Sequence, residues 1–297
     1  MPSPNGTTPG LRRLAPVVYC RCNTVVEHVM SNNRQFDNLG DFISAMAGVA
    51  MTKAFSNLDK FDIDMKNVGN FGNFSNIGET MRVACEAGVP LGELDLADAG
   101  IRHVAVMGPD DVVIETGEDT AITVDGDEDA ADAIRFQLDD GKLSIMRVTG
   151  KRQNGTAMVK ITLPKLRKIS LAGSGSVHCA AIRGGKAKIA VAGSGNVQCG
   201  EIEVDQLKVQ MLGSGSVSGK GSAKSLSLKI AGSGNVGLEG VSVESANVSM
   251  AGSGNAVFAS DGDVSASMAG SGNVTVKGRA RCTVKGVGSG RLVCEPA

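Results

Sequence analysis

One short phrase, an apolar residue and a small residue followed by Gly-Ser-Gly, recurs seven times in the C-terminal half of this chain. In the last copy Gly286 replaces the apolar residue. The first glycines of the phrases follow one another every 18 to 20 residues: Gly173, Gly193, Gly213, Gly232, Gly252, Gly270 and Gly288. Repeats of about this length are typical of solenoids, in which each unit buries its apolar face only by stacking on its neighbours.

The residues around each phrase alternate between apolar and polar. Apolar side chains occupy the positions four before, two before and four after the first glycine in nearly every copy. The three columns are Ile169, Ile189, Val209, Leu228, Val248, Ala266 and Val284; Leu171, Val191, Met211, Ile230, Met250 and Met268; and Val177, Val197, Val217, Val236, Ala256, Val274 and Leu292. Positions two apart share one side of a strand, whereas a helix would need offsets of three and four.

The repeat therefore predicts an all-β fold, a single-stranded parallel β-helix with about 18–20 residues per turn. Glycine suits corners that need a positive φ or a close approach of backbones. Asn or Ser follows the phrase in six of the seven copies, and a stacked column of such residues can exchange hydrogen bonds between turns. Strands are expected to begin near Ile101, where alternation starts, and Pro164 closes the region that leads into the regular repeats.

The first hundred residues follow a different pattern. We expect a flexible lead over 1–35, a helical and Asn/Gly-rich region over 36–99, and the β-helix domain over 100–297. An apolar stripe predicts a helix over 37–58, which would pack on its own domain, cover an end of the solenoid or bind a membrane surface. The triplets from Asn67 to Gly78 predict a loop or linker, with a short ordered stack as the alternative.

Composition excludes some classes of function. The chain has 30 Lys plus Arg against 31 Asp plus Glu, so no overall charge favours nucleic acid or an anionic surface. It has no Trp and one Tyr, which argues against a sugar-stacking cleft. No apolar run is long enough to span a bilayer. The short run after Arg12 and Arg13 is interrupted by Pro16 and is not accepted as a signal peptide.

The seven cysteines match no zinc-binding spacing. Cys179, Cys199 and Cys294 each lie six residues after a first glycine, in a column that is otherwise apolar. Cys179 and Cys199 should stack on adjacent turns, at a separation that a disulfide can span. We expect buried thiols there, because free cysteine packs as a small hydrophobic side chain and the odd count favours thiols. A Cys179–Cys199 bridge is the alternative.

Charge is segregated in the region before the repeats. Between Asp110 and Asp140 there are 12 acidic residues and one basic residue, Arg135, whereas Gly141 to Ser170 contains eight basic residues and no acid. If the first turns place these segments side by side, their charges can pair across strands. The cluster Asp125-Gly-Asp-Glu-Asp129 could hold Ca²⁺, but it lacks the full loop pattern, and a solvated acidic turn is the preferred interpretation.

Other motifs give no chemistry. Gly232-Ser-Gly-Asn-Val-Gly237 fits a dinucleotide fingerprint, but a strand rather than a helix should follow it. His178 is the one histidine within the repeats and has no evident acid partner with which to activate a Gly-Ser-Gly serine. Glu201, Glu203 and Asp205 lie on one turn, whereas a polysaccharide-cleaving groove needs acids on several turns. We therefore predict no catalytic, cofactor-binding or metal-binding residues.

The strand segments together with the repeats resemble a known family. Val112-Val-Ile114, Asp140-Gly-Lys-Leu-Ser-Ile145, Val159-Lys-Ile-Thr-Leu-Pro164 and the Gly-Ser-Gly phrases are similar to the auto-transporter adhesin head domain, or GIN domain, of bacteria, over about residues 101–292. The resemblance implies a β-helical fold and a place in the envelope or at the cell surface. It supplies no catalytic residues.

These observations favour a non-enzymatic scaffold that binds a surface or envelope ligand, either protein or polysaccharide. A carbohydrate-active β-helix enzyme is one alternative. A self-assembling envelope or cytoskeletal filament is another, because the open ends of a solenoid can pair with a second copy.

Overall fold

The structure, a computed structural model, describes residues 88–97, 99–147 and 155–295. Nearly all of them lie in one sheet that coils into a solenoid, with one short α-helix and one 3-10 turn. The elements in chain order are η3 (Leu91–Glu93), β1 (His103–Gly108), β2 (Asp111–Thr116), β3 (Ala121–Gly126), α5 (Glu128–Ala131), β4 (Ile134–Asp139), β5 (Lys142–Arg147), β6 (Ala157–Leu163), β7 (Lys168–Gly173), β8 (Ser176–Gly193), β9 (Asn196–Gly213), β10 (Ser216–Gly232), β11 (Asn235–Gly252), β12 (Asn255–Gly270), β13 (Asn273–Lys277), β14 (Arg281–Gly288) and β15 (Arg291–Glu295).

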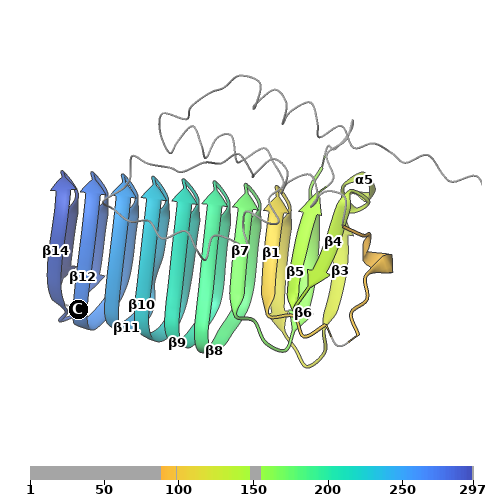
Figure 1. The fold of residues 1–297 in the computed structure, drawn as a ribbon, viewed down its shortest axis with the longest axis horizontal. Helices are drawn as coiled ribbons and strands as arrows, with labels where there is room; N and C mark the ends of the chain where they lie inside the picture. The colour runs from red at the N-terminus through yellow and green to blue at the C-terminus, as the bar shows by residue number, and fades with distance from the viewer. Residues whose placement is uncertain (1–87, 98, 148–154, 296–297) are drawn as a thin grey trace, which may run out of the picture. The chain divides into compact units, whose positions relative to one another are not determined.

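From β7 onward the chain winds in parallel layers, one for each Gly-Ser-Gly phrase. The strands stand side by side in a single row (Figure 1). The first glycines of all seven phrases are paired in one column: Gly173, Gly193, Gly213, Gly232, Gly252, Gly270 and Gly288. The predicted parallel β-helix is confirmed.

The interior consists of stacked apolar columns. Val177, Val197 and Val217 are aligned on adjacent layers, and each is at most 1% exposed. The same column continues into the layers that precede the repeats, through Val112 and Val159. Each inward side chain therefore packs on its counterparts above and below, which is how units too small to have a core of their own become stable.

The corner formed by each phrase requires glycine at the first glycine position for two reasons. Gly193 has a φ of +115°, a region that L-residues with a side chain rarely adopt. A Cβ at this position would lie 2.5 Å from the carbonyl oxygen of Gly173 in the previous layer. That oxygen accepts hydrogen bonds from the N–H groups of Ser194 and Gly195, at 3.1 and 2.9 Å. The close approach of backbones is thus part of the contact between layers.

The order of the layers differs from the order of the chain at the N-terminal end. β1 lies between β5 and β7 (Figure 1), and β2 pairs with β6 on one side and β8 on the other. From β1 and β2, which belong to one layer, the chain turns outward through β3, α5 and β4. It then returns as β5 and β6 and passes the first layer to start β7. This arrangement was not predicted, because the segments before residue 168 lack the repeated phrase that marks the layers.

The N-terminal end is closed by strands that run in the opposite direction. β3 pairs with β6 and β4 with β5, both antiparallel. On the far side of β4, Val89 and Phe136 exchange two backbone hydrogen bonds of 2.8 Å, and Phe136 is 1% exposed. Antiparallel pairing ends the parallel stack and covers its last apolar layer.

Several predictions fall on residues outside the described ones. These are the lead over 1–35, the helix over 37–58 and the Asn-Gly triplets, so the division of the chain at residues 35 and 99 stays a prediction. Within the described ranges, no helix is long and apolar enough to cross a membrane.

Candidate interaction surface

One outward-facing column of side chains runs across nine layers of the solenoid. It lies on the strands that lead into the Gly-Ser-Gly corner, at positions that alternate with the buried columns. In spatial order the column is Lys142, His103, Lys168, Lys188, Lys208, Ser227, Asn247, Ser265 and Thr283. We call its first five members, four lysines and a histidine on successive layers, the basic column.

A second outward column, two residues earlier on the same strands, runs beside it. From β8 to β14 it comprises Lys186, Gln206, Ser225, Ser245, Asp263 and Arg281. The two columns line a hollow of about 1270 Å³ that extends from β7 to β14, which we call the groove. The groove is an elongated surface that crosses the strands, not a closed pocket.

The groove is strongly positive although the chain as a whole has a net charge of −1. Among the described residues that line it, seven are cationic and one is acidic. They are Arg167, Lys168, Lys186, Lys188, Lys208, Arg281 and Lys285, and the acid is Asp263. Asp263 accepts a hydrogen bond from Arg281 Nε at 2.9 Å, so the one carboxylate is already engaged by a cation. The positive charge is concentrated at the end where Lys168, Lys188 and Lys208 are stacked.

Like charges in neighbouring strands repel one another, and the basic column shows the effect. Burial lowers the pKa of Lys142 below its ordinary value, the charge of Lys168 lowers it further, and Asp139 acts in the opposite direction. His103 Nε2 lies 3.0 Å from Ser170 Oγ, which fixes the ring between the lysine layers. The stacking of Lys168, Lys188 and Lys208 on adjacent layers concentrates positive charge on this part of the surface.

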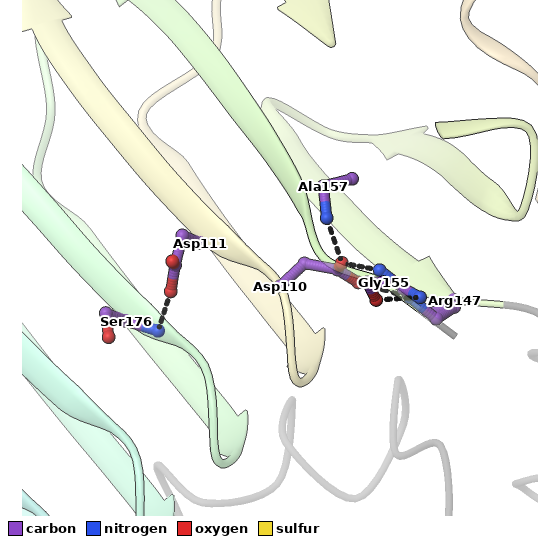
Figure 2. A network of polar contacts seen from close by, with 6 residues as sticks. All are labelled: Asp110, Asp111, Arg147, Gly155, Ala157 and Ser176. Carbon is purple, nitrogen blue, oxygen red and sulfur yellow. Dashed lines mark hydrogen bonds and ion pairs between the residues drawn. The ribbon is translucent and has the colours of Figure 1, made fainter. Parts of the chain in front are cut away.

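A buried ion pair holds the corner of the N-terminal layers (Figure 2). Asp110 follows Gly108, which is aligned with Gly173, so Asp110 occupies the place of the third residue of a Gly-Ser-Gly phrase. Its carboxylate accepts hydrogen bonds from Arg147 Nε at 2.9 Å, from Arg147 Nη2, and from the Ala157 N–H at 3.2 Å. The side chain of Asp110 is 4% exposed and that of Arg147 is 6% exposed. The hydrogen bonds to Asp110 raise the pKa of Arg147.

The neighbouring residue links the first layer to the repeats. Asp111 Oδ1 accepts a hydrogen bond of 3.0 Å from the Ser176 N–H (Figure 2). The predicted pairing of the acidic and basic segments is thus found in Asp110–Arg147, and also in the exposed pair of Lys160 and Asp125 at 3.1 Å. These contacts connect layers and are structural.

The residues after the phrases form the expected ladder along another corner. Ser216 Oγ donates to Asn196 Oδ1 at 2.6 Å, and Asn255 Nδ2 donates to Asn235 Oδ1 at 3.0 Å. Asn273 continues the ladder toward Asn255 at 3.4 Å. The predicted exchange of side-chain hydrogen bonds between turns is confirmed.

The four cysteines among the described residues divide into two pairs. Cys179 and Cys199 are aligned on adjacent layers, and both are buried free thiols, as predicted. Contact with the Cys179 thiol and burial together raise the pKa of Cys199 well above its ordinary value, so this thiol stays protonated and inert.

No pairing was predicted for the other two described cysteines, Cys282 and Cys294, which form a disulfide. Cys294 does lie in the predicted column, beside Val276. Cys282 lies beside Val264 in a different inward column, so the bridge joins two walls of the last layer. Column spacing along the sequence shows which residues stack between layers, and it does not show which residues meet across one layer.

The remaining candidates from the sequence do not assemble into a site. Asp125, Asp127 and Asp129 are exposed around helix α5, and no group of three or more His, Cys, Asp or Glu side chains within the described ranges is arranged to hold a metal ion. The dinucleotide-like Gly232–Gly237 stretch leads into strand β11, as expected for a chance match.

The candidate acids and base of a hydrolase are also accounted for. Glu201 and Glu203 both contact Arg183, and Asp205 Oδ1 lies 2.7 Å from Lys224 Nζ. His178 is exposed and is aligned with Val113 and Gln198, neither of which is an acid that could orient it.

The groove was not predicted from the sequence, although part of its signal is there. Lys168, Lys188 and Lys208 are spaced by 20 residues, in register with the glycine phrases. Lys142 and His103 show no such spacing, because their layers are out of chain order. The overall charge balance hid the local excess of cations.

The comparisons with known proteins agree with this architecture. A family described as "Putative auto-transporter adhesin, head GIN domain" matches residues 102–280, which is more than half of the chain. The chain belongs to this family. The match confirms the resemblance seen in the strand segments and the repeats. No curated protein sequence matches this GIN-domain chain.

Three solved structures share the fold of this chain. A putative adhesin of Bacteroides fragilis has a TM-score of 0.59 at 20% identity, covering 66% of this chain and 92% of its own. A putative lipid binding protein of Parabacteroides distasonis has a TM-score of 0.52 at 20% identity, with coverages of 65% and 92%. A putative adhesin of the same species has a TM-score of 0.51 at 22% identity, with coverages of 66% and 92%. Likenesses at this level of identity show the fold.

Proposed function

We propose that this GIN-domain protein is a non-catalytic interaction scaffold of the bacterial cell envelope or surface. The observation that carries the proposal is the groove, a charged hollow that crosses layer after layer of a rigid solenoid. Its lining is suited to hold an extended ligand by many weak contacts, and its one described carboxylate is paired with Arg281. Repetitive, concave surfaces of this kind are how solenoid proteins bind partners.

The disulfide supports the location. Cys282 and Cys294 are bonded in the last layer, and structural disulfides persist mainly in oxidising compartments such as the periplasm and the cell surface. The family description points to the same place. A cytoplasmic protein would be expected to keep these thiols reduced.

The test is to locate the native protein by cell fractionation and protease shaving of intact cells, with differential alkylation of its cysteines. We expect an envelope or surface fraction in which Cys282 and Cys294 resist alkylation until reductant is added. A cytoplasmic, protease-shielded protein with four reactive or denaturant-exposed thiols among Cys179, Cys199, Cys282 and Cys294 would overturn the proposal.

The C-terminal end favours self-assembly as a second candidate function. β14 and β15 are the last strands of the row, and Val284, Val287 and Val293 on them are 54%, 83% and 39% exposed. An uncovered strand edge with apolar side chains can pair with a second copy. Sedimentation velocity over a range of concentrations tests this: end-to-end association that Val287→Lys abolishes supports it, whereas a monomer at all concentrations refutes it.

A further inference from the structure

We propose that the groove binds a linear acidic polysaccharide, a chain of sugars bearing carboxylate or sulfate groups, that lies across the strands and along Lys168, Lys188 and Lys208. This inference rests on the proposed function and gives its ligand a chemical class. It is carried by the register of the column, by the local charge, and by the two kinds of side chain that follow one another along the groove.

The spacing of the cations fits such a chain. Neighbouring strands are about 4.8 Å apart, so Lys168, Lys188 and Lys208, the three members of the basic column that line the groove, cover about 10 Å. A pyranose residue advances a polysaccharide by a similar distance. An acidic group on every sugar, or on every second sugar, would therefore meet a cation of the column without any change in the protein. The rigid sheet keeps this spacing fixed, so the binding site is preorganised.

The rest of the column suits the uncharged part of a sugar chain. Beyond Lys208 the aligned positions carry Ser227, Asn247, Ser265 and Thr283. Hydroxyl and amide groups can both donate and accept hydrogen bonds, as sugar hydroxyls require. A polysaccharide that extends past the basic column thus finds polar partners instead of more cations. Few aromatic residues are needed, because charge and hydrogen bonds replace stacking as the means of recognition.

The electrostatics favour a polyanion over a single small anion. Seven cationic residues and one acidic residue line one elongated hollow in a chain whose net charge is −1. A polyanion can contact several of these cations at once, whereas a small anion can contact only one or two of them. Lys142, Lys168 and Lys188 already have polar or electrostatic partners in the chain, so the ligand must compete with those contacts. We therefore expect binding that is moderate in strength and sensitive to salt.

Other polyanions fit the groove less well. A bilayer is flat and presents headgroups over an area, whereas the cations here line an elongated hollow. Single-stranded nucleic acid is generally held by aromatic side chains on which its bases stack, and the described residues that line the groove include none. These ligands serve as competing outcomes of the test.

The experiment measures binding of the purified full-length protein to defined probes by isothermal titration calorimetry. The probes are polygalacturonate, dextran sulfate, neutral dextran, phosphatidylglycerol vesicles and oligo-dT. The groove variant combines Lys168→Gln, Lys188→Gln and Lys208→Gln. The matched control combines Lys160→Gln, Lys220→Gln and Lys277→Gln, which removes the same charge from exposed lysines that do not line the groove.

We expect at least one acidic polysaccharide to bind and neutral dextran not to bind. The groove variant should lose affinity by about tenfold or more, the control by less than about twofold, and binding should disappear near 0.5 M salt. Circular dichroism should show both variants folded. No binding by either acidic polysaccharide, equal loss in the two variants, or tighter binding of vesicles or oligo-dT than of polysaccharide would each overturn the inference.

The result is independent of where the protein resides in the cell. A cytoplasmic protein that binds polygalacturonate through the groove would refute the proposed envelope role and leave the ligand class intact. A surface-exposed protein that binds no acidic polysaccharide would support the envelope role and refute the ligand class.

Discussion

The two ends of the solenoid are finished in different ways. At the N-terminal end, antiparallel strands β3 and β4 cover the stack, and a buried ion pair between Asp110 and Arg147 holds the corner. At the C-terminal end, β14 and β15 are uncovered, and a disulfide between Cys282 and Cys294 joins two walls of the last layer. One end is closed by noncovalent packing, while the other is held by a covalent bond and keeps its strand edges available.

The difference shows what a stack of identical units cannot do for itself. Each inner layer is stabilised by two neighbours, but a terminal layer has only one, so its loss of packing must be offset by other means. The N-terminal end solves this with irregular sequence, and the C-terminal end with a cross-link. The two ends should therefore contribute differently to the stability of the whole solenoid.

The largest effect should come from breaking the ion pair at the closed end. Arg147→Ala would leave the Asp110 carboxylate buried without its cation, and breaking a buried pair typically costs about 3–5 kcal/mol. The matched change at the open end is Arg281→Ala, which removes the partner of Asp263 where both side chains are mostly exposed. That loss should be about 0–1 kcal/mol. Urea unfolding of both variants measures the contrast, and equal losses would contradict it.

The disulfide should rank next. Reducing or removing the Cys282–Cys294 bridge, which closes a loop of 12 residues, should lower stability by about 3 kcal/mol. The double variant Cys282→Ala, Cys294→Ala should match the reduced wild type in thermal unfolding. The control is Cys199→Ala, because Cys199 is a free thiol in the wild type. Reductant should still lower the melting temperature of this variant, since its Cys282–Cys294 bridge is intact. If reductant leaves the wild-type melting temperature unchanged, the bridge does not hold the last layer.

Glycine substitutions at the two ends should separate local from global effects. Gly173→Ala and Gly288→Ala both place a side chain at a positive φ, +124° and +119°, against the backbone of the previous layer. Strain of this kind costs about 1–3 kcal/mol. Near the closed end the cost should lower global stability, whereas in the last layer it should mainly increase local opening. Native-state hydrogen exchange distinguishes the two. Gly237→Ala, where the new Cβ would have its nearest contact at 3.6 Å, is the mild control.

The smallest effect should be a pH dependence near the closed end. Because the pKa of Lys142 is lowered in the folded state, the unfolded chain binds more protons between that value and the ordinary one. The charged lysine thus costs stability at pH 7, and this cost fades as pH rises toward the ordinary pKa. Lys142→Gln should be slightly more stable than the wild type at pH 7, with the difference shrinking at higher pH. Thermal melts across that range check it, with Lys220→Gln as an exposed control.

The features that recur in every layer could be predicted from the sequence. Equivalent positions recur along the chain, so the stacked valines, the corner glycines, the Asn ladder and the Cys179–Cys199 neighbours could all be predicted by counting residues. Contacts across a layer carry no such signal. Cys282 and Cys294 lie in different inward columns of the last layer. Whether they meet depends on the path of the chain within that layer, and the spacing of the repeats does not show this path.

The candidate site falls between these two cases. Lys168, Lys188 and Lys208 recur with the glycine phrases and could have been identified as one column. Lys142 and His103 join them only because β1 is inserted between β5 and β7, a topology for which the irregular N-terminal segments give no periodic signal. The sign of the groove's charge was likewise hidden by acids elsewhere in the chain.

The insertion of β1 has a consequence for how the chain assembles. β1 is bordered on both sides by strands synthesised after it, so this layer cannot be completed until the chain has gone out, returned and passed it. Such distant pairings make loop closure costly and slow. The later repeats need only the layer just before them and can add one at a time. We therefore expect the slow step of folding to lie at the closed end, with the repeats adding to it one layer at a time.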